Sequence, residues 1–202
     1  MSIYTLKPRF QSLLRPLTTS LARAGVTANH VTVAACLVSV AVAAFVAWNS
    51  AERWPFLLIP LWMFLRMAFN AIDGMLAREF GQKSRLGAYL NELTDVVSDT
   101  LLYLPFAFVL PLGTWPVTTV IVLAVISEYA GALGLMVGAS RRYDGPMGKS
   151  DRAFVFGALA LWVGLTTALP DFATWLVWVV ALLLVVTIGN RVRRGLAEKV
   201  SP

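Results

Sequence analysis

Six long apolar stretches follow one another along the chain, and short polar segments separate them. A helix needs about 20 residues to cross the hydrocarbon core of a bilayer, and each stretch is close to that length. The six stretches cover residues 29–48, 54–77, 86–110, 117–137, 153–169 and 172–189. This pattern predicts an all-α integral membrane protein with six transmembrane helices.

The first 24 residues have a different pattern, in which apolar and basic side chains alternate at roughly helical spacing. Leu6, Phe10 and Leu13 are interleaved with basic residues, and Pro8 and Pro16 would interrupt a long helix. We predict a short amphipathic helix that lies in the membrane interface, with a disordered tail as the alternative. The expected organisation is therefore a leader (1–24), a six-helix membrane domain (25–195) and a short tail (196–202).

Composition supports a membrane protein and excludes a soluble domain. Of the 202 residues, 58% are hydrophobic and only 14% are charged. The net charge of +6 would favour nucleic acid as a partner in a soluble protein, but here the basic residues flank apolar spans. An anionic membrane surface explains them better, so we expect membrane lipids and no nucleic acid as partners. The single Cys36 excludes an internal disulfide.

The distribution of basic residues predicts the orientation of the chain in the membrane. Fifteen of the 17 lysines and arginines fall on one side of the six predicted spans, and only Arg53 lies in an opposite loop. Basic residues accumulate on the cytoplasmic side of membrane proteins. We therefore expect a bacterial inner (cytoplasmic) membrane protein with both termini in the cytoplasm. Arg66 lies inside the second span, and the pattern does not assign it a partner.

Two polar clusters interrupt the second and third spans. The first consists of Asn70, Asp73, Gly74, Ala77 and Arg78, and the second of Gly87, Asn91, Glu92, Asp95 and Asp99. Within each cluster the main polar residues recur at three- or four-residue steps, so they share one helical face. Two adjacent antiparallel helices would bring these faces together. Carboxylate and amide oxygens without a lysine between them suit Mg²⁺, Mn²⁺ or Ca²⁺ rather than zinc.

The same residues resemble a known family motif. The CDP-alcohol phosphotransferases carry D-x2-D-G-x2-A-R-x8-G-x3-D-x3-D, and the segment from Asn70 to Asp95 matches every spacing of it. Two positions depart from the motif, because its first and third aspartates are Asn70 and Asn91 here. The resemblance implies transfer of a phosphatidyl group from CDP-diacylglycerol to an alcohol acceptor, with release of CMP. It also implies Mg²⁺ or Mn²⁺ as cofactor and a homodimer. The orientation predicted from the basic residues places the site toward the cytoplasm.

The resemblance also implies a role for each motif residue. Asp73 would be a metal ligand, with Asn70 and Asn91 as neutral ligands, and Asp95 would act as general base or assist a second metal. Arg78 would contact the diphosphate, while Gly74, Ala77 and Gly87 would leave room for the cytidine. The four motif positions lose two negative charges, so we expect either one tightly held metal or two metals with Asp99 recruited as a ligand.

Two further segments resemble parts of the family. The sequence GVTANHVT before the first span resembles a T-P-N-x-x-T pattern, which implies that Asn29 and Thr32 line the nucleotide end of the site. Ordinary capping of the helix by Thr27 and Asn29 is an equal alternative. The loop SRRYDGPMGKSDR places Lys149 and Arg152 at the start of the fifth span, where family members hold an acceptor phosphate. These two residues favour a phosphorylated acceptor such as glycerol 3-phosphate, and the alternative is a plain basic flank.

The sequence is compatible with other functions and with several charge pairings. The loss of two acidic ligands raises the alternative of a catalytically impaired relative that only binds lipid or nucleotide. A small ion transporter is a third possibility, but the glycine and arginine spacings have no transport rationale. Glu128 in the fourth span is a functional candidate. We favour its pairing with Arg66 or with an arginine at a helix end.

Overall fold

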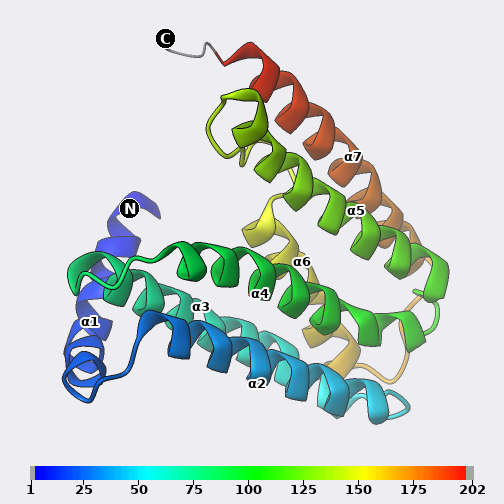
Figure 1. Ribbon diagram of the computed structural model, residues 1–202. Helices are drawn as coiled ribbons and strands as arrows, with labels where there is room; N and C mark the ends of the chain where they lie inside the picture. Colours follow the sequence, from blue (N-terminus) through cyan, green and yellow to red (C-terminus); the bar gives the residue numbers. More distant parts are fainter. Residues whose placement is uncertain (1–2, 199–202) are drawn as a thin grey trace. The chain divides into compact units, whose positions relative to one another are not determined.

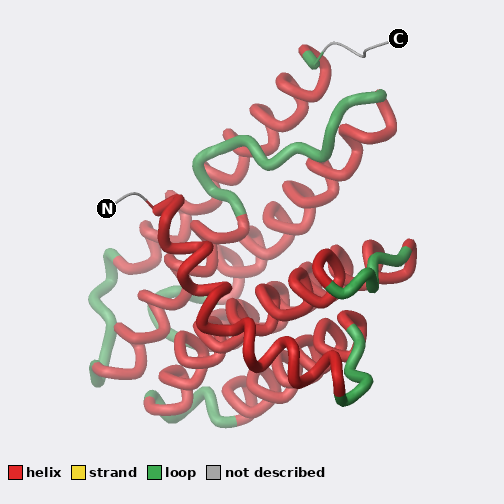
Figure 2. The backbone as a smooth tube through the Cα atoms, turned by 90° about the vertical axis from the view of Figure 1, so that its left-hand side faces the viewer, coloured by secondary structure: helices red, strands yellow, loops and turns green. Residues whose placement is uncertain are grey.

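The computed structural model describes residues 3–198, which form helices joined by loops without any strand (Figures 1 and 2). Contacts divide these residues into two units, and three helices continue from one unit into the other. Unit 1 comprises residues 3–41 and 61–98, and unit 2 comprises residues 42–60 and 99–198. The all-α prediction is confirmed for this part of the chain. Residues 199–202 of the predicted tail and the first two residues of the predicted leader lie outside it.

Unit 1 contains α1 and most of the helices that carry the two polar clusters. The helices that contribute to it are α1 (Ile3–Arg23), α2 (Ala28–Trp48), α3 (Leu58–Glu79) and α4 (Arg85–Tyr103). Ala28, Val31, Ile72 and Leu76 form a buried apolar cluster, against which Leu14 and other side chains of α1 pack. This packing attaches α1 to the helices that carry the motif.

Helix α1 is longer than the two prolines in the leader predict. It continues without interruption from Ile3 to Arg23, although Pro8 and Pro16 both lie within it. Pro16 is exposed, and so is Ser12, whose carbonyl loses its backbone hydrogen bond to the proline. Solvent can hydrate a carbonyl on the exposed face, so the helix continues. The expectation of a short, interrupted helix was therefore wrong.

Unit 2 contains the remaining helices. They are η1 (Trp54–Leu57), η2 (Leu104–Phe108), α5 (Thr114–Leu133), η3 (Gly134–Val137), α6 (Lys149–Leu165) and α7 (Ala173–Ala197). Helices α5 and α7 pack side by side over their length (Figure 1). A cluster of aromatic rings fills part of the interior, where Tyr103 stacks on Phe156 and Phe106 meets both Phe56 and Phe156 edge-on. The third apolar stretch leaves the α-helical form at Tyr103 because Pro105 follows in η2.

Four helical segments of the described chain are long and apolar enough to cross a membrane. They are Ala28–Trp48, Trp54–Glu79, Thr114–Val137 and Ala173–Ala197. Helix α4 is 19 residues long but carries Arg85, Glu92, Asp95 and Asp99, and α6 has only 17 residues. A chain with four such segments is an integral membrane protein by length and composition. The structure thus supports four of the six predicted spans by this criterion.

Candidate active site

Asp73 is the buried acid of the first polar cluster, and Thr32 holds it. The carboxylate lies on α3 and is only 6% exposed. The Thr32 hydroxyl of α2 lies 2.8 Å from Asp73 Oδ2 and 3.0 Å from the backbone oxygen of Ala28. Its single hydrogen can serve only one of these acceptors fully, so Asp73 retains strong acceptor capacity. The structure thus brings two of the predicted site residues together.

Asn29 and Gly87 are also neighbours in unit 1. A Cβ atom added to Gly87 would lie 2.9 Å from Asn29 Oδ1, which is too close for an ordinary contact. The glycine therefore allows α4 to approach the first turn of α2. The capping alternative holds for Thr27, whose side-chain oxygen accepts the backbone N–H of His30 at 3.2 Å. Gln82, in the turn between α3 and α4, accepts the Ala28 N–H at 2.7 Å, and the same helix end gains a second cap.

The Arg78 guanidinium folds back over the motif. A Cβ atom at Gly74 would lie 2.8 Å from Arg78 Nη2, so the missing side chain at position 74 leaves the space that this cation occupies. Arg78 itself is exposed, and the neighbouring Ala77 is half-buried. A delocalised cation beside an acidic helix face is suited to bind phosphate oxygens.

Arg66 has its partner on the next helix, at the last aspartate of the motif. Its Nη2 atom lies 2.8 Å from Asp95 Oδ1 and 3.4 Å from the Asp95 backbone oxygen. The Arg66 side chain is 7% exposed and the Asp95 side chain 21%. The ion pair links α3 to α4 within unit 1. The sequence placed both residues in the membrane region but did not pair them.

The donor set of the motif fits one divalent ion better than two. Within residues 3–198, no three His, Cys, Asp or Glu side chains are grouped closely enough to hold a metal. Asp73 and the neutral amides of Asn70 and Asn91 offer hard oxygen atoms of the type that Mg²⁺ and Mn²⁺ bind. Asp95, by contrast, is paired with a guanidinium, which repels a dication. Asn91 is exposed on α4, so its amide is accessible.

Unit 2 contains a second polar centre, at which three arginines surround one buried glutamate. Glu128 accepts from Arg152 at 2.8 Å and from Arg141 at 3.1 Å, and Arg191 Nη1 lies 3.3 Å from it. The arginines come from α6, the loop after η3, and α7. The expected pairing of Glu128 with a helix-end arginine is therefore confirmed. Arg66, the other partner considered for Glu128, pairs with Asp95.

Asp99 belongs to the same centre. Its Oδ2 atom lies 3.7 Å from Arg152 Nη2, and Asp99 is buried. Three guanidinium groups and two carboxylates leave this centre with one net positive charge. The Nε atoms of Arg152 and Arg191 are buried and have no hydrogen-bond partner among the described residues. Unsatisfied buried donors on cations are expected to attract an anionic oxygen.

Glycine makes room for this centre. A Cβ atom at Gly131 would lie 2.6 Å from Arg141 Nη1 and 2.6 Å from the Arg142 backbone oxygen. No side chain larger than hydrogen therefore fits at this position.

The start of α6 lies next to the same centre in the sequence. Lys149 is the first residue of α6, and the backbone N–H of Gly148 bonds to Asp151 Oδ2 at 2.9 Å. Gly148 is thus the N-terminal cap of α6, with Asp151 as its side-chain partner. Arg191 was not among the sequence candidates, because nothing in the sequence distinguishes it from the other basic residues that follow the last span.

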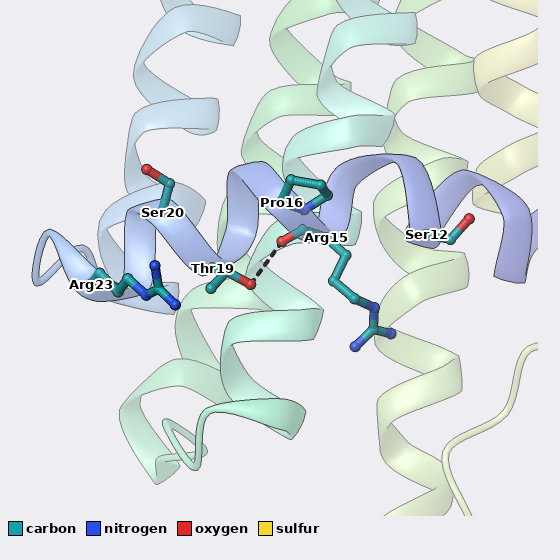
Figure 3. A pocket seen from close by; sticks show the side chains of 6 residues that line it. All are labelled: Ser12, Arg15, Pro16, Thr19, Ser20 and Arg23. Atoms are coloured by element: carbon teal, nitrogen blue, oxygen red, sulfur yellow. Dashed lines mark hydrogen bonds between the residues drawn. The ribbon is translucent and has the colours of Figure 1, made fainter.

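A separate pocket of about 430 Å³ lies on the exposed face of α1 (Figure 3). Its walls are hydroxyl, proline and arginine side chains of one helix: Ser12, Arg15, Pro16, Thr19, Ser20 and Arg23. The Arg15 guanidinium also pairs with Glu79 at the end of α3. No motif residue lines this pocket, so it is not the site described above.

The loop that carries Arg141 is fastened to α7 by two acidic side chains outside the membrane spans. Partial burial acts to raise the pKa of Asp144, but hydrogen bonds and charge from Arg142 and Arg194 outweigh it and lower that pKa. The pKa of Glu198 is also lowered, first by hydrogen bonds from Ser140 and then by Arg142. Both carboxylates therefore stabilise the folded loop only while they are ionised.

This attachment should weaken in acid. Because both pKa values are depressed, the stabilisation is complete above the ordinary values of 3.8 and 4.5 and is lost as the pH falls below them. We expect amide hydrogen exchange in residues 140–144 to accelerate between pH 5 and pH 3, after correction for the intrinsic exchange rate. Mass spectrometry in detergent measures it, with residues 173–184 of α7 as the internal control. Unchanged protection at pH 3 would contradict this attachment.

A family model provides the decisive comparison for the whole site. Residues 25–188 match the model described as CDP-alcohol phosphatidyltransferase, which covers most of the chain. The chain belongs to the CDP-alcohol phosphatidyltransferase family. This is an enzyme family that transfers phosphatidyl groups, and the matched range contains the motif of unit 1 and, of the second polar centre, every member except Arg191.

Two curated relatives agree with this membership. The chain is 45% identical over 197 residues to the inner membrane protein YnbA of Escherichia coli K12, with 96% of each chain covered. It is 31% identical over 136 residues to the archaetidylinositol phosphate synthase of Aeropyrum pernix, over 64% of this chain and 69% of that protein. The name of the first relative places it in the inner membrane, and the second name describes a synthase.

Solved structures of the phosphatidylinositol phosphate synthase PgsA1 of Mycobacterium tuberculosis share the fold. The structure with CDP-DAG bound has a TM-score of 0.76 at 23% identity and covers 89% of this chain and 92% of that chain. The structure with manganese and citrate has a TM-score of 0.75 at 22% identity, with 90% and 88% covered. At this identity the likeness shows that this chain and PgsA1 share a fold.

Proposed function

We propose that this protein transfers the phosphatidyl group of CDP-diacylglycerol to an alcohol acceptor and releases CMP. The observation that carries the proposal is the assembly of the family motif in unit 1. There the Thr32 hydroxyl donates to Asp73, the Arg78 guanidinium lies against Gly74, and the Asn29 side chain lies against Gly87. The CDP-DAG bound to PgsA1 supports the same donor. The CDP group would be recognised by Asn29, Thr32, Gly74, Ala77, Arg78 and Gly87.

The chemistry requires one P–O bond to form and one to break. The acceptor hydroxyl oxygen bonds to the phosphorus on the lipid side of the diphosphate, and CMP departs with the electron pair of the broken bond. Arg78 binds the diphosphate oxygens and orients them. Asp95 receives the proton of the acceptor hydroxyl. A divalent ion, Mg²⁺ or Mn²⁺, would be held by Asp73 with Asn70 and Asn91, and it would supply neutralisation of the phosphate charge. Manganese in a PgsA1 structure supports this class of ion.

For the acceptor we propose a phosphorylated alcohol such as glycerol 3-phosphate or an inositol phosphate. The arginine centre of unit 2 supports this choice, because it has a net positive charge and two unsatisfied buried Nε donors. The names of two matched proteins, an archaetidylinositol phosphate synthase and a phosphatidylinositol phosphate synthase, point to the same class. Arg152 and Lys149 would contact the acceptor phosphate, and Arg141 and Arg191 would extend the set. Because Glu128 already accepts from these arginines, the phosphate must compete with it.

Replacing Arg191 with glutamine tests the acceptor assignment. A hydrogen bond to a charged group is worth about 1.5–3 kcal/mol, so the KM for a phosphorylated acceptor should rise about 10- to 100-fold. The kcat should change less, because the donor site is intact. Steady-state CMP release with glycerol 3-phosphate, inositol phosphate, glycerol and inositol would be compared. The matched control is R193Q on the exposed face of α7. Equal turnover of the phosphate-free alcohols by the parent protein would contradict the assignment.

The membrane arrangement belongs to the same proposal. We propose that α4 and α6 also cross the bilayer, which gives six spans in a catalytic domain of residues 25–195, followed by a cytoplasmic tail (196–202). Burial of Ser98 and Asp99 inside the protein supports this for α4, and its 19 residues match the length of a span. The leader (1–24) would lie in the interface, where its exposed Arg15 and Arg23 meet lipid phosphates. Both termini and the site would face the cytoplasm of a bacterial cell, and the protein would form a homodimer.

A binding protein without catalysis is the second candidate. The observations that favour it are Asn70 and Asn91 in place of acids and the neutralisation of Asp95 by Arg66. Measurement of CDP-diacylglycerol binding alongside CMP release separates the two. Binding without release, for every acceptor tested and with either Mg²⁺ or Mn²⁺, would establish the binding protein.

A further inference from the structure

Arg66 is a cation inside a membrane-spanning segment, and this position requires an explanation. It lies within Trp54–Glu79, which is apolar enough to cross a membrane, and the residue is 6% exposed. A buried guanidinium is expensive unless an anion compensates it. The described compensation is Asp95, with 2.8 Å between Arg66 Nη2 and Asp95 Oδ1. The span therefore contains a costly buried group whose charge is directed at the motif.

Arg66 lies on the same helical face as the acidic motif. Asn70, Asp73 and Ala77 follow it at four, seven and eleven residues, which keeps all four positions on one face of α3. Helices α3 and α4 run in opposite directions with the same rise per residue. The Arg66–Asp95 contact therefore places Asn70 level with Asn91, within about one helical turn. The cation and the two asparagines belong to one continuous polar surface in unit 1.

The charges of this surface balance differently from those of the family motif. Four aspartates carry −4, which two divalent ions neutralise. In this chain the same four positions carry −2, and Arg66 reduces the sum to −1. One bound divalent ion would then bring the net charge of the surface to +1. Two bound ions would bring it to +3, although the surface has only two carboxylates. Asp99 does not restore the balance, because its carboxylate lies 3.7 Å from Arg152 in unit 2.

We propose that the Arg66 guanidinium is a resident cation that replaces one of two metal ions, so that this chain binds at most one divalent ion. Arg66 then acts as a positioning residue, which holds Asp95 and supplies positive charge toward the donor diphosphate. The inference rests on the proposed function in assigning this surface to the diphosphate. It accounts together for an arginine inside a span and for asparagine at two ligand positions, because a fixed guanidinium lowers the demand for anionic ligands.

Metal stoichiometry tests the proposal without relying on catalysis. Mn²⁺ alone would be titrated into the purified full-length protein in nanodiscs, with free Mn²⁺ followed by electron paramagnetic resonance. The set comprises the parent protein, N70D/N91D, R66Q/N70D/N91D and the control R85Q/N70D/N91D, in which an exposed arginine of α4 is removed instead. We expect no more than one ion per chain for the parent, N70D/N91D and the control. Only R66Q/N70D/N91D should bind two.

The outcomes distinguish this inference from the proposed function. Binding of two ions by the parent protein, or by N70D/N91D with Arg66 present, would contradict the proposal that Arg66 replaces one metal ion. If R66Q/N70D/N91D folds, as judged by size exclusion and thermal unfolding, and still binds no second ion, the inference is also wrong. If that variant does not fold, the parent and N70D/N91D titrations still decide the question. Absence of CMP release, in contrast, would remove the proposed function and leave the ion count unaffected.

Discussion

Replacing Asp73 with asparagine is expected to reduce CMP release from CDP-diacylglycerol at least about 100-fold. Asp73 is the buried carboxylate of the four motif positions, and it would carry the main anionic charge for a divalent ion. An asparagine oxygen still accepts the hydrogen bond that Thr32 donates at 2.8 Å, so the local fold should remain. The measurement is CMP formation at saturating Mn²⁺ with the acceptor that gives the highest turnover.

The matched control for this substitution is D171N. Asp171 is an exposed loop residue before α7, and the same chemical change there should leave CMP release unaltered. Thermal unfolding of both variants would show whether the fold is retained. Undiminished turnover of D73N would remove Asp73 from the metal site and would end the proposed assignment of the motif.

Replacing Glu128 with glutamine should produce the largest loss of stability. Glu128 lies within hydrogen-bond or ion-pair distance of three arginines, of which Arg152 and Arg191 are only 1% exposed. Removal of one member of a buried ion pair costs about 3–5 kcal/mol, because the remaining charge stays buried without compensation. We expect the lower end of this range, since the amide oxygen can still accept one hydrogen bond. Thermal unfolding in detergent would measure the decrease.

E52Q is the appropriate control for that experiment. Glu52 is exposed in the turn after α2, so its neutralisation should leave the unfolding temperature nearly unchanged. An E128Q protein with the unfolding temperature of the parent would show that the arginine centre contributes no stability. It would also indicate that another anion neutralises the arginines in the purified protein.

The helices and the motif could be predicted because both depend on local periodicity. A stretch such as 29–48 must be helical in a bilayer whatever its neighbours are, and the structure has a helix over Ala28–Trp48. The spacing from Asn70 to Asp95 likewise determines which side chains share a helical face. The effect of proline on the first helix was predicted less well. Pro16 did not interrupt α1, because its position on the exposed face, which a linear pattern shows only weakly, allows solvent to replace the lost hydrogen bond.

The pairing of charges was decided by the tertiary structure. Arg66 and Asp95 are 29 residues apart, and Arg191 and Glu128 are 63 apart, so no helical repeat relates them. Sequence alone determined that this chain is an all-α membrane protein with a CDP-alcohol phosphatidyltransferase motif, since hydropathy and residue spacing are properties of the chain itself. Only the tertiary structure determined which arginine neutralises which acid. That choice depends on how helices distant in sequence pack, and in our proposal it limits the number of metal ions that the site can hold.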